Sequence, residues 1–201
     1  NHIFKDGLVI IKKLLGLKMH WRRKYNFNVS NLGIDLINMN QWVKNKSSLT
    51  NRIKKIANLK IKLVTNNYKN KNLLLSEKNF FPLHKAENIF LREVIIFANG
   101  VPIMYARTVL PRKYLRGYWN DIKKLNTNSL SRIVYENPSI KRSNFSYLAP
   151  SLNNKILKKI NSLKIDSKNL VIGRQSYFEY KRKNILLTEY FFEAINNFEF
   201  E

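Results

Sequence analysis

Two apolar runs joined by Asn99-Gly100 form the clearest pattern of hydrophobic and polar positions along this chain. Both runs, Ile89 to Ala98 and Val101 to Leu110, are rich in β-branched and aromatic residues. The Asn-Gly pair predicts a β-hairpin, because a type I′ turn needs positive φ at both central residues. Counting outward from a two-residue turn places Arg92 directly opposite Arg107 on one face. Like charges in direct opposition destabilise a hairpin, so this pair favours a bound anion.

The rest of the pattern predicts helices that alternate with further antiparallel strands. Ser47 and Ser48 are candidate caps for a second helical segment, and Thr127 or Asn128 for a short later one. Helical spacing is found over residues 8–17, 39–57, 112–125, 130–134 and 152–163, and strand patterns over 59–65, 73–75, 170–180 and 184–192. Residues 18–40, 66–72 and 76–82 show no helical or strand pattern and are predicted to be irregular. Strands grouped in hairpins with helices before and between them predict an α+β fold with a single antiparallel sheet.

Composition fits one domain over residues 1–201, with residues 1–40 as a loosely packed N-terminal extension. The hydrophobic fraction of 44% supports a sizeable core at this length. No apolar run reaches the roughly 18–20 residues of a membrane span, so we expect none. Cysteine is absent and the three histidines are far apart, so we expect no metal site.

The net charge of +24 raises the possibility of a nucleic-acid-binding protein. However, lysine is spread along the whole chain and asparagine is over-used beside it, as AT-rich codons would produce. We favour this compositional explanation over a dedicated basic surface and expect no nucleic-acid partner. The charge would still attract a small anionic ligand.

Glu189 lies in the apolar strand pattern ILLTEYFF, on the same face as Leu187 and Phe191. A carboxylate there should either pair with an arginine or have a pKa raised by desolvation. The first is a structural role, and the second fits a site residue that binds a ligand hydroxyl or handles a proton. The residues alone leave both open. Glu93 falls on the other face of the hairpin, where a structural salt bridge is favoured. The sequence contains neither a glycine-rich phosphate loop nor a nucleophile elbow.

The segments LREVIIFANGVPIMYARTVLP, NSLSRIVYE and ILLTEYFF, taken in this order and spacing, resemble the chorismate lyase family. The resemblance covers 91–192 well and extends weakly to Ser48-Leu49-Thr50. It implies a single antiparallel sheet with packed helices and covering flaps. It also implies a carbon–oxygen lyase that cleaves chorismate to 4-hydroxybenzoate and pyruvate without a cofactor.

The resemblance also implies roles for five residues. Arg92 would grip the ring carboxylate, and Glu189 would face the ring hydroxyl or the ether oxygen. Arg107 would contact the enolpyruvyl carboxylate as a second cation. Leu49 and Leu130 correspond to positions whose backbone groups touch the ligand. The catalytic residues implied are Arg92 and Glu189.

Two other functions compete with this one. A non-catalytic ligand-binding domain of the same fold, as in the effector domains of transcription regulators, would bind without turnover. A basic nucleic-acid-binding protein is the weaker alternative. For the lyase we expect a monomer acting on the small molecule chorismate, in a plastid or the bacterial cytoplasm. Its product would then lead to plastoquinone or ubiquinone.

Overall fold

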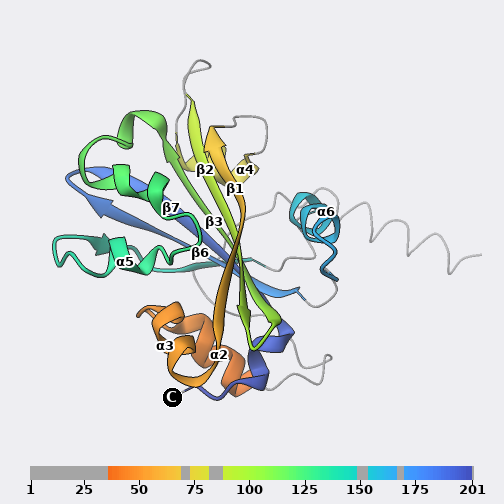
Figure 1. The fold of residues 1–201 in the computed structure, drawn as a ribbon. Coiled ribbons are helices and arrows are strands. Elements are labelled where there is room, and N and C mark those ends of the chain that lie inside the picture. Colours follow the sequence, from red (N-terminus) through yellow and green to blue (C-terminus); the bar gives the residue numbers. More distant parts are fainter. Residues whose placement is uncertain (1–35, 69–72, 82–87, 149–153, 167–169, 201) are drawn as a thin grey trace, which may run out of the picture.

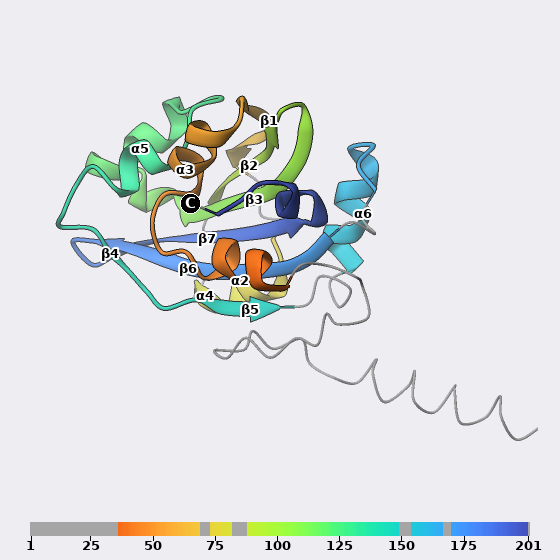
Figure 2. The same cartoon turned by 90° about the horizontal axis from the view of Figure 1, so that it is seen from below.

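The computed structural model describes residues 36–68, 73–81, 88–148, 154–166 and 170–200 (Figure 1). In these residues one antiparallel sheet has the order β1-β2-β3-β7-β6-β4, and β5 also pairs with β6 (Figures 1 and 2). The strands are β1 (Leu59–Tyr68), β2 (Ile89–Ala98), β3 (Val101–Pro111), β4 (Lys141–Arg142), β5 (Ser146–Leu148), β6 (Leu170–Tyr180) and β7 (Lys183–Phe192). The α-helices are α2 (Leu36–Lys44), α3 (Leu49–Ile56), α4 (Leu75–Phe80), α5 (Ser131–Val134) and α6 (Asn154–Ser162). The 3-10 helices are η2 (Arg112–Tyr114), η3 (Gly117–Lys124) and η6 (Glu193–Asn197). This arrangement confirms the predicted α+β fold.

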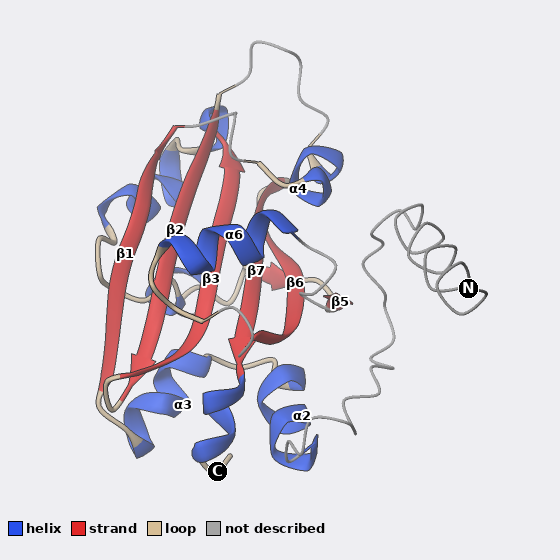
Figure 3. Ribbon diagram, turned by 90° about the vertical axis from the view of Figure 1, so that its right-hand side faces the viewer, coloured by secondary structure: helices blue, strands red, loops and turns tan. Residues whose placement is uncertain are grey.

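Helices cover both faces of the sheet (Figures 1 and 3). The main core cluster joins one face to α2, α3, α5, η3 and η6, with Trp42 and Trp119 among its fully buried members. On the opposite face, Ile156 and Ile160 of α6 pack on Tyr105 and Tyr190. No helix among the residues described is long and apolar enough to cross a membrane.

The central hairpin has the predicted turn. Asn99 and Gly100 have φ values of 49° and 81°, as a type I′ turn requires. The other hairpin, between β6 and β7, turns through Lys181 and Arg182, whose φ values of 48° and 60° are also positive. Ser48 caps α3 as predicted, since its side chain accepts a hydrogen bond from the amide of Asn51.

The predicted register of the central hairpin is wrong beyond its first two pairs. Ala98 pairs with Val101 as counted, but Ile96 pairs with Met104 instead of Ile103, because a β-bulge adds a residue to β3. A shift of one residue moves every following side chain of that strand to the other face. Arg92 therefore pairs with Thr108 and lies on the face opposite Arg107.

Several other boundaries also differ from prediction. Leu75, predicted to continue a strand, begins α4. The stretch after Pro111 forms the two 3-10 segments η2 and η3, with Leu115 and Arg116 between them, where an α-helical stretch was expected. Residues 36–44, partly predicted as irregular, form α2. The helix predicted over residues 8–17 lies outside the described residues.

Candidate active site

Arg92 is a buried cation without an ionic partner. It lies on β2, next to the edge strand β1, and only 2% of its surface is exposed. Its Nη2 donates to the backbone carbonyls of Asn126 and Asn128 over 3.0 and 2.7 Å, and its Nε has no hydrogen-bond partner. Among the described residues no carboxylate pairs with it. An arginine in this state is a binding site for an anion, because burial of a cation is costly until a counter-charge arrives.

Burial also changes the acidity of this group. Desolvation lowers the pKa of the Arg92 guanidinium from its ordinary value to about 10. The side chain therefore stays charged at neutral pH. An anion that binds beside it regains interaction energy that the protein alone does not supply.

A cleft opens on the Arg92 face of the sheet and encloses about 530 Å³ of empty space, part of it open to solvent. Its walls are largely apolar and come from β1, β2, β3, β4, β6, β7, α3 and α5. The apolar lining residues are Leu49, Ile61, Val94, Ile96, Met104, Ala106, Leu130, Val134, Phe178 and Leu187. Its charged lining residues are Arg92, Arg142, Arg174 and Glu189. A largely apolar pocket with a few convergent charges is the usual form of a small-molecule site.

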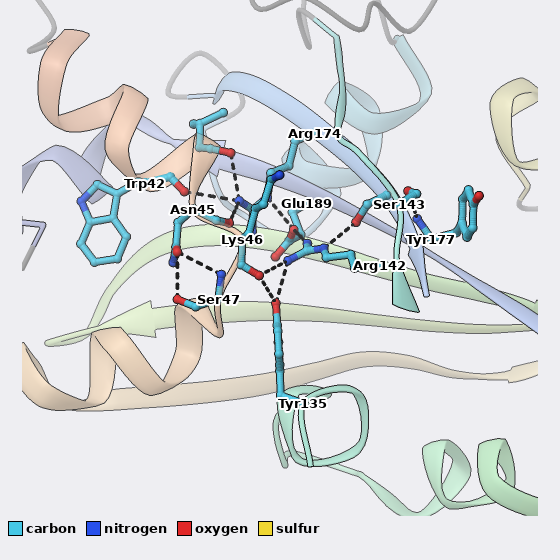
Figure 4. A network of polar contacts seen from close by, with 12 residues as sticks. Trp42, Asn45, Lys46, Ser47, Tyr135, Arg142, Ser143, Arg174, Tyr177 and Glu189 are labelled. Carbon is cyan, nitrogen blue, oxygen red and sulfur yellow. Dashed lines mark hydrogen bonds and ion pairs between the residues drawn. The ribbon is translucent and has the colours of Figure 1, made fainter. Parts of the chain in front are cut away.

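Glu189 forms a buried ion-pair network with two arginines (Figure 4). Its Oε2 lies 2.6 Å from Nε of Arg174, which is its direct cross-strand partner on β6, and 3.4 Å from Nη2 of Arg142. Burial alone would raise the pKa of Glu189, but Arg174 and Arg142 together hold it below the ordinary value. Glu189 is thus an ionised acceptor. The alternative of a raised pKa was wrong, and the predicted arginine pairing is confirmed.

Arg174 joins this network to the end of α2. Its Nη1 donates to the carbonyls of Val43 and Asn45 over 2.9 and 2.8 Å, with a longer contact of 3.4 Å to Trp42. The last carbonyls of a helix lack intrahelical donors and carry partial negative charge, so a guanidinium stabilises them. Arg174 therefore fixes both Glu189 and the start of the loop between α2 and α3.

Arg142 also lines the cleft, and Figure 4 shows its polar contacts. Its Nε donates to Oγ of Ser176 over 3.0 Å, and its Nη1 donates to the Lys46 carbonyl over 3.1 Å and to the Tyr135 hydroxyl over 2.6 Å. The Tyr135 hydroxyl in turn donates to the same carbonyl over 2.9 Å. Tyr135 is 40% exposed, so this end of the cleft borders solvent.

Three buried hydroxyls form a second polar group in the wall of the cleft. Oγ1 of Thr50 lies 2.6 Å from Oγ of Ser129 and 3.1 Å from Oγ of Ser131, and the two serine oxygens are 2.8 Å apart. This triangle joins the start of α3 to the loop that accepts hydrogen bonds from Arg92. Leu49 and Leu130, which adjoin these hydroxyl residues in the sequence, also line the cleft.

Arg107 does not line the cleft. On the other face of the sheet, its Nε and Nη2 donate to the two carboxylate oxygens of Glu77 over 2.8 and 2.9 Å. Its Nη1 pairs with Glu93, which also accepts from the Tyr105 hydroxyl. The structural salt bridge predicted for Glu93 is confirmed. The expectation that Arg107 supplies a second cation to the ligand is corrected, because the bulge in β3 turns it away.

Of the five residues singled out from the sequence, Leu49, Arg92, Leu130 and Glu189 come together in the cleft. Sequence reasoning missed Arg142 and Arg174. A signal for Arg174 was available, since counting outward from a turn at residues 181 and 182 places it opposite Glu189. No comparable pattern marks Arg142, which lies on the two-residue strand β4.

The charges that line the cleft do not cancel. Three guanidinium groups and one carboxylate leave a net charge of two positive. A small dianion with an apolar body would match both this charge and these walls. The described residues contain no group of three or more His, Cys, Asp or Glu side chains placed to hold a metal ion.

Among solved structures, the effector domain of PhnF from Mycobacterium smegmatis is similar to this chain. The TM-score is 0.51 at 10% sequence identity, and the match covers 74% of this chain and 90% of that one. At this identity the likeness shows the fold alone.

Sequence comparisons are more specific. A probable chorismate pyruvate-lyase from Nitrosospira multiformis is 27% identical over 157 residues, which cover 77% of this chain and 86% of that protein. Another from Hydrogenovibrio crunogenus is 27% identical over 158 residues, which cover 78% and 82%. The chorismate pyruvate-lyase of Pectobacterium atrosepticum is 28% identical over 102 residues, which cover 50% and 56%. The family model for chorismate lyase matches residues 20–198. With that match over most of its length, the chain belongs to the chorismate lyase family.

Proposed function

We propose that this protein is a lyase that converts chorismate to 4-hydroxybenzoate and pyruvate. The observation that carries the proposal is the cleft with two net positive charges, in which Arg92 has no counterion among the described residues. Chorismate is a small dianion with a carbocyclic body, so its charge and its apolar surface both match. Family membership supports the same substrate class.

In this proposal, Arg92 binds the ring carboxylate through charge-assisted hydrogen bonds. Glu189, held ionised by its two arginines, accepts a hydrogen bond from the ring hydroxyl. Leu49 and Leu130 contact the ligand between these two points. The apolar walls keep water from the ring, which strengthens each electrostatic contact.

The reaction balances without an additional reactant. The bond between the ring and the ether oxygen breaks, and the enolpyruvyl group departs with that oxygen. The hydrogen on the neighbouring hydroxyl-bearing carbon leaves the ring, and the methylene carbon of the departing group gains one, which completes pyruvate. The ring becomes aromatic, and this drives the reaction. The task of the protein is to orient a dianion and to stabilise charge on the departing oxygen.

We also propose that the product supplies the head group of a quinone, ubiquinone in a bacterial cytoplasm or plastoquinone in a plastid. The support is chemical, since 4-hydroxybenzoate provides an aromatic ring with an oxygen opposite a carboxyl group. The relatives named above are bacterial. If the proposal holds, cells that lack this protein should lose the quinone and regain it when 4-hydroxybenzoate is supplied.

The central test is incubation of the purified protein with chorismate, with both products quantified. We expect equimolar 4-hydroxybenzoate and pyruvate. Arg92→Met should lower kcat/KM by at least about 30-fold, because truncation of a buried charge contact costs 2 kcal/mol or more. Arg116→Met removes an exposed arginine outside the cleft and serves as the matched control.

Ligand binding gives a second readout. At about 100 times its Kd, 4-hydroxybenzoate should stabilise the wild-type protein by about 2.7 kcal/mol, which appears as a higher Tm. Arg92→Met should lose this shift, and Arg116→Met should keep it. Binding of chorismate without product formation would refute the lyase and favour a ligand-binding domain of the same fold.

A further inference from the structure

The network around Glu189 contains two arginines that differ in how fully they are satisfied. Arg174 is 1% exposed, has a short contact to Glu189 and caps the end of α2. Arg142 is more accessible, with 12% of its side chain exposed, and its contact to Glu189 is long at 3.4 Å. Arg174 is therefore a fixed part of the framework, whereas Arg142 presents its outer nitrogen to the cleft.

The donors of Arg142 show which atom is available. Of the five N–H groups of a guanidinium, one on Nε bonds Ser176 and two on Nη1 bond Lys46 and Tyr135. Within the part of the chain that the structure describes, Nη2 has only the long contact to Glu189. Three hydrogen bonds thus orient the guanidinium group, while Nη2 can still donate hydrogen bonds to an anion. This is the arrangement of a preorganised anchor.

The surroundings of Arg142 also favour an added negative charge. The guanidinium carbons of Arg142 and Arg174 lie 4.4 and 4.5 Å from the ring centre of Phe145, so two like charges flank one aromatic ring. Glu189 supplies a single negative charge between them. Burial lowers the pKa of Arg142, and the charge of Arg174 lowers it further, against the opposing effect of Glu189. Two arginines and one carboxylate leave one net positive charge here, and a second anion would neutralise it.

The order of strands places Arg142 beyond Glu189 as seen from Arg92. Arg92 lies on β2 and Arg142 on β4, four strand positions apart, while Glu189 lies between them on β7. Four strand spacings amount to about 19 Å between backbones, and both side chains extend inward from these positions to line one cleft. A ring held between Arg92 and Glu189 would therefore extend a neighbouring substituent towards Arg142.

We propose that Arg142 is the anchor for the second carboxylate of the substrate, the one on the enolpyruvyl side chain. This inference rests on the proposed function, and it assigns to Arg142 the role that Arg107 cannot fill from the opposite face. Arg142 thereby distinguishes the dianionic substrate from the monoanionic product, which lacks the second carboxylate. Arg92 and Glu189 contact the part that substrate and product share.

The experiment compares two ligands in Arg142→Gln and Arg142→Lys. For Arg142→Gln we expect kcat/KM for chorismate to fall at least about 30-fold, as for a truncated buried charge contact. The Kd of 4-hydroxybenzoate, measured by calorimetry, should stay within about threefold of the wild-type value. Arg142→Lys keeps the charge but loses the planar fork, so it should recover part of the loss. Lys141→Gln, at the exposed neighbour on β4, is the control for net charge.

The loss for chorismate relative to the loss for 4-hydroxybenzoate distinguishes two roles of Arg142, direct binding of the substrate carboxylate and support of Glu189. If Arg142 only holds Glu189 in place, both variants should weaken chorismate and 4-hydroxybenzoate equally, and that result overturns the proposal. Unchanged values for both ligands also overturn it. If Arg142→Gln fails to fold, Arg142→Lys carries the same comparison. If the wild-type protein binds chorismate without turnover, the lyase proposal fails, and the ratio of the two binding constants still decides the role of Arg142.

Discussion

Glu93 and Arg107 are direct cross-strand partners, and the ion pair between them lies on the sheet face opposite Arg92. The same guanidinium holds Glu77 at the start of α4, and Lys159 of α6 lies 3.7 Å from the other Glu93 oxygen. The Arg107–Glu93 pair therefore connects two helices to the sheet, α4 through Arg107 and α6 through Glu93. The sheet thus carries arginine–carboxylate networks on both faces, one that lines the cleft and one that supports the fold.

We predict that Arg107→Met destabilises the protein without weakening its ligand. Removal of this cation leaves Glu77 buried without its arginine and Glu93 with the longer contact of 3.7 Å to Lys159, which costs about 3–5 kcal/mol. For a chain of this size that corresponds to a fall in Tm of about 10 °C. Below the transition, the Kd of 4-hydroxybenzoate should match that of the wild-type protein. If Arg107→Met lost ligand binding while its Tm stayed at the wild-type value, the prediction would be wrong and Arg107 would belong to the ligand site.

A second prediction concerns acid stability. The pKa of Glu189 is lower in the folded protein than its ordinary value of 4.5, so the unfolded chain binds more protons on acidification. The stabilisation that ionised Glu189 gives the folded protein is fully present above about pH 4.5 and is lost as the pH falls through the folded-state pKa of Glu189. Glu189→Gln should cost about 3 kcal/mol at pH 7, because Arg174 and Arg142 lose their counterion.

Urea unfolding of the wild-type protein and of Glu189→Gln from pH 7 to pH 3 measures the difference between their free energies of unfolding, which should shrink below about pH 4.5. The kcat/KM profile should show no Glu189 ionisation between pH 6 and pH 8. An acidic limb in that interval that disappears in Glu189→Gln would show instead that the carboxyl group titrates near neutrality in the reacting protein.

A third prediction tests the close packing behind the network. A Cβ built on Gly173 would lie 2.9 Å from Cε1 of Tyr190, whose ring is fully buried, and 3.4 Å from the carbonyl oxygen of Leu148. Gly173→Ala should therefore destabilise the protein by about 1–3 kcal/mol through overpacking. Thermal unfolding provides the measurement. In the double variant with Tyr190→Leu the cost should be less than the sum of the single costs, and strict additivity would exclude this contact as the cause.

The fold was largely predictable, because its strongest signals are local. Asn99-Gly100, the apolar runs beside it and the cap at Ser48 each specify their own segment through backbone geometry or a single hydrogen bond. The errors occur where tertiary contacts override the local pattern. Leu75 belongs to α4, whose buried Glu77 is held by Arg107 from a distant strand.

The site was predictable only in part, for a geometric reason. One additional residue in β3 reverses the side on which Arg107 lies. Pro102 is compatible with an edge strand as well as with a bulge, so it does not by itself specify the additional residue. Arg142 was out of reach because a strand of two residues has no periodicity to detect. Arg92 and Glu189 were found because a charge inside a long apolar strand is conspicuous.

The loop between α2 and α3 contributes to the cleft through carbonyl oxygens, that of Asn45 to Arg174 and that of Lys46 to Arg142. Every amino acid presents the same carbonyl, so the contact that Lys46 makes with Arg142 does not depend on the Lys46 side chain. The side chain of Asn45, by contrast, accepts hydrogen bonds from the amide and the hydroxyl of Ser47 over 3.0 and 2.8 Å. A homologue could therefore keep this contact in space while the amino acid at position 46 differs. Mutational scanning should find residue 46 permissive and residue 45 less so, although Arg142 itself is not permissive.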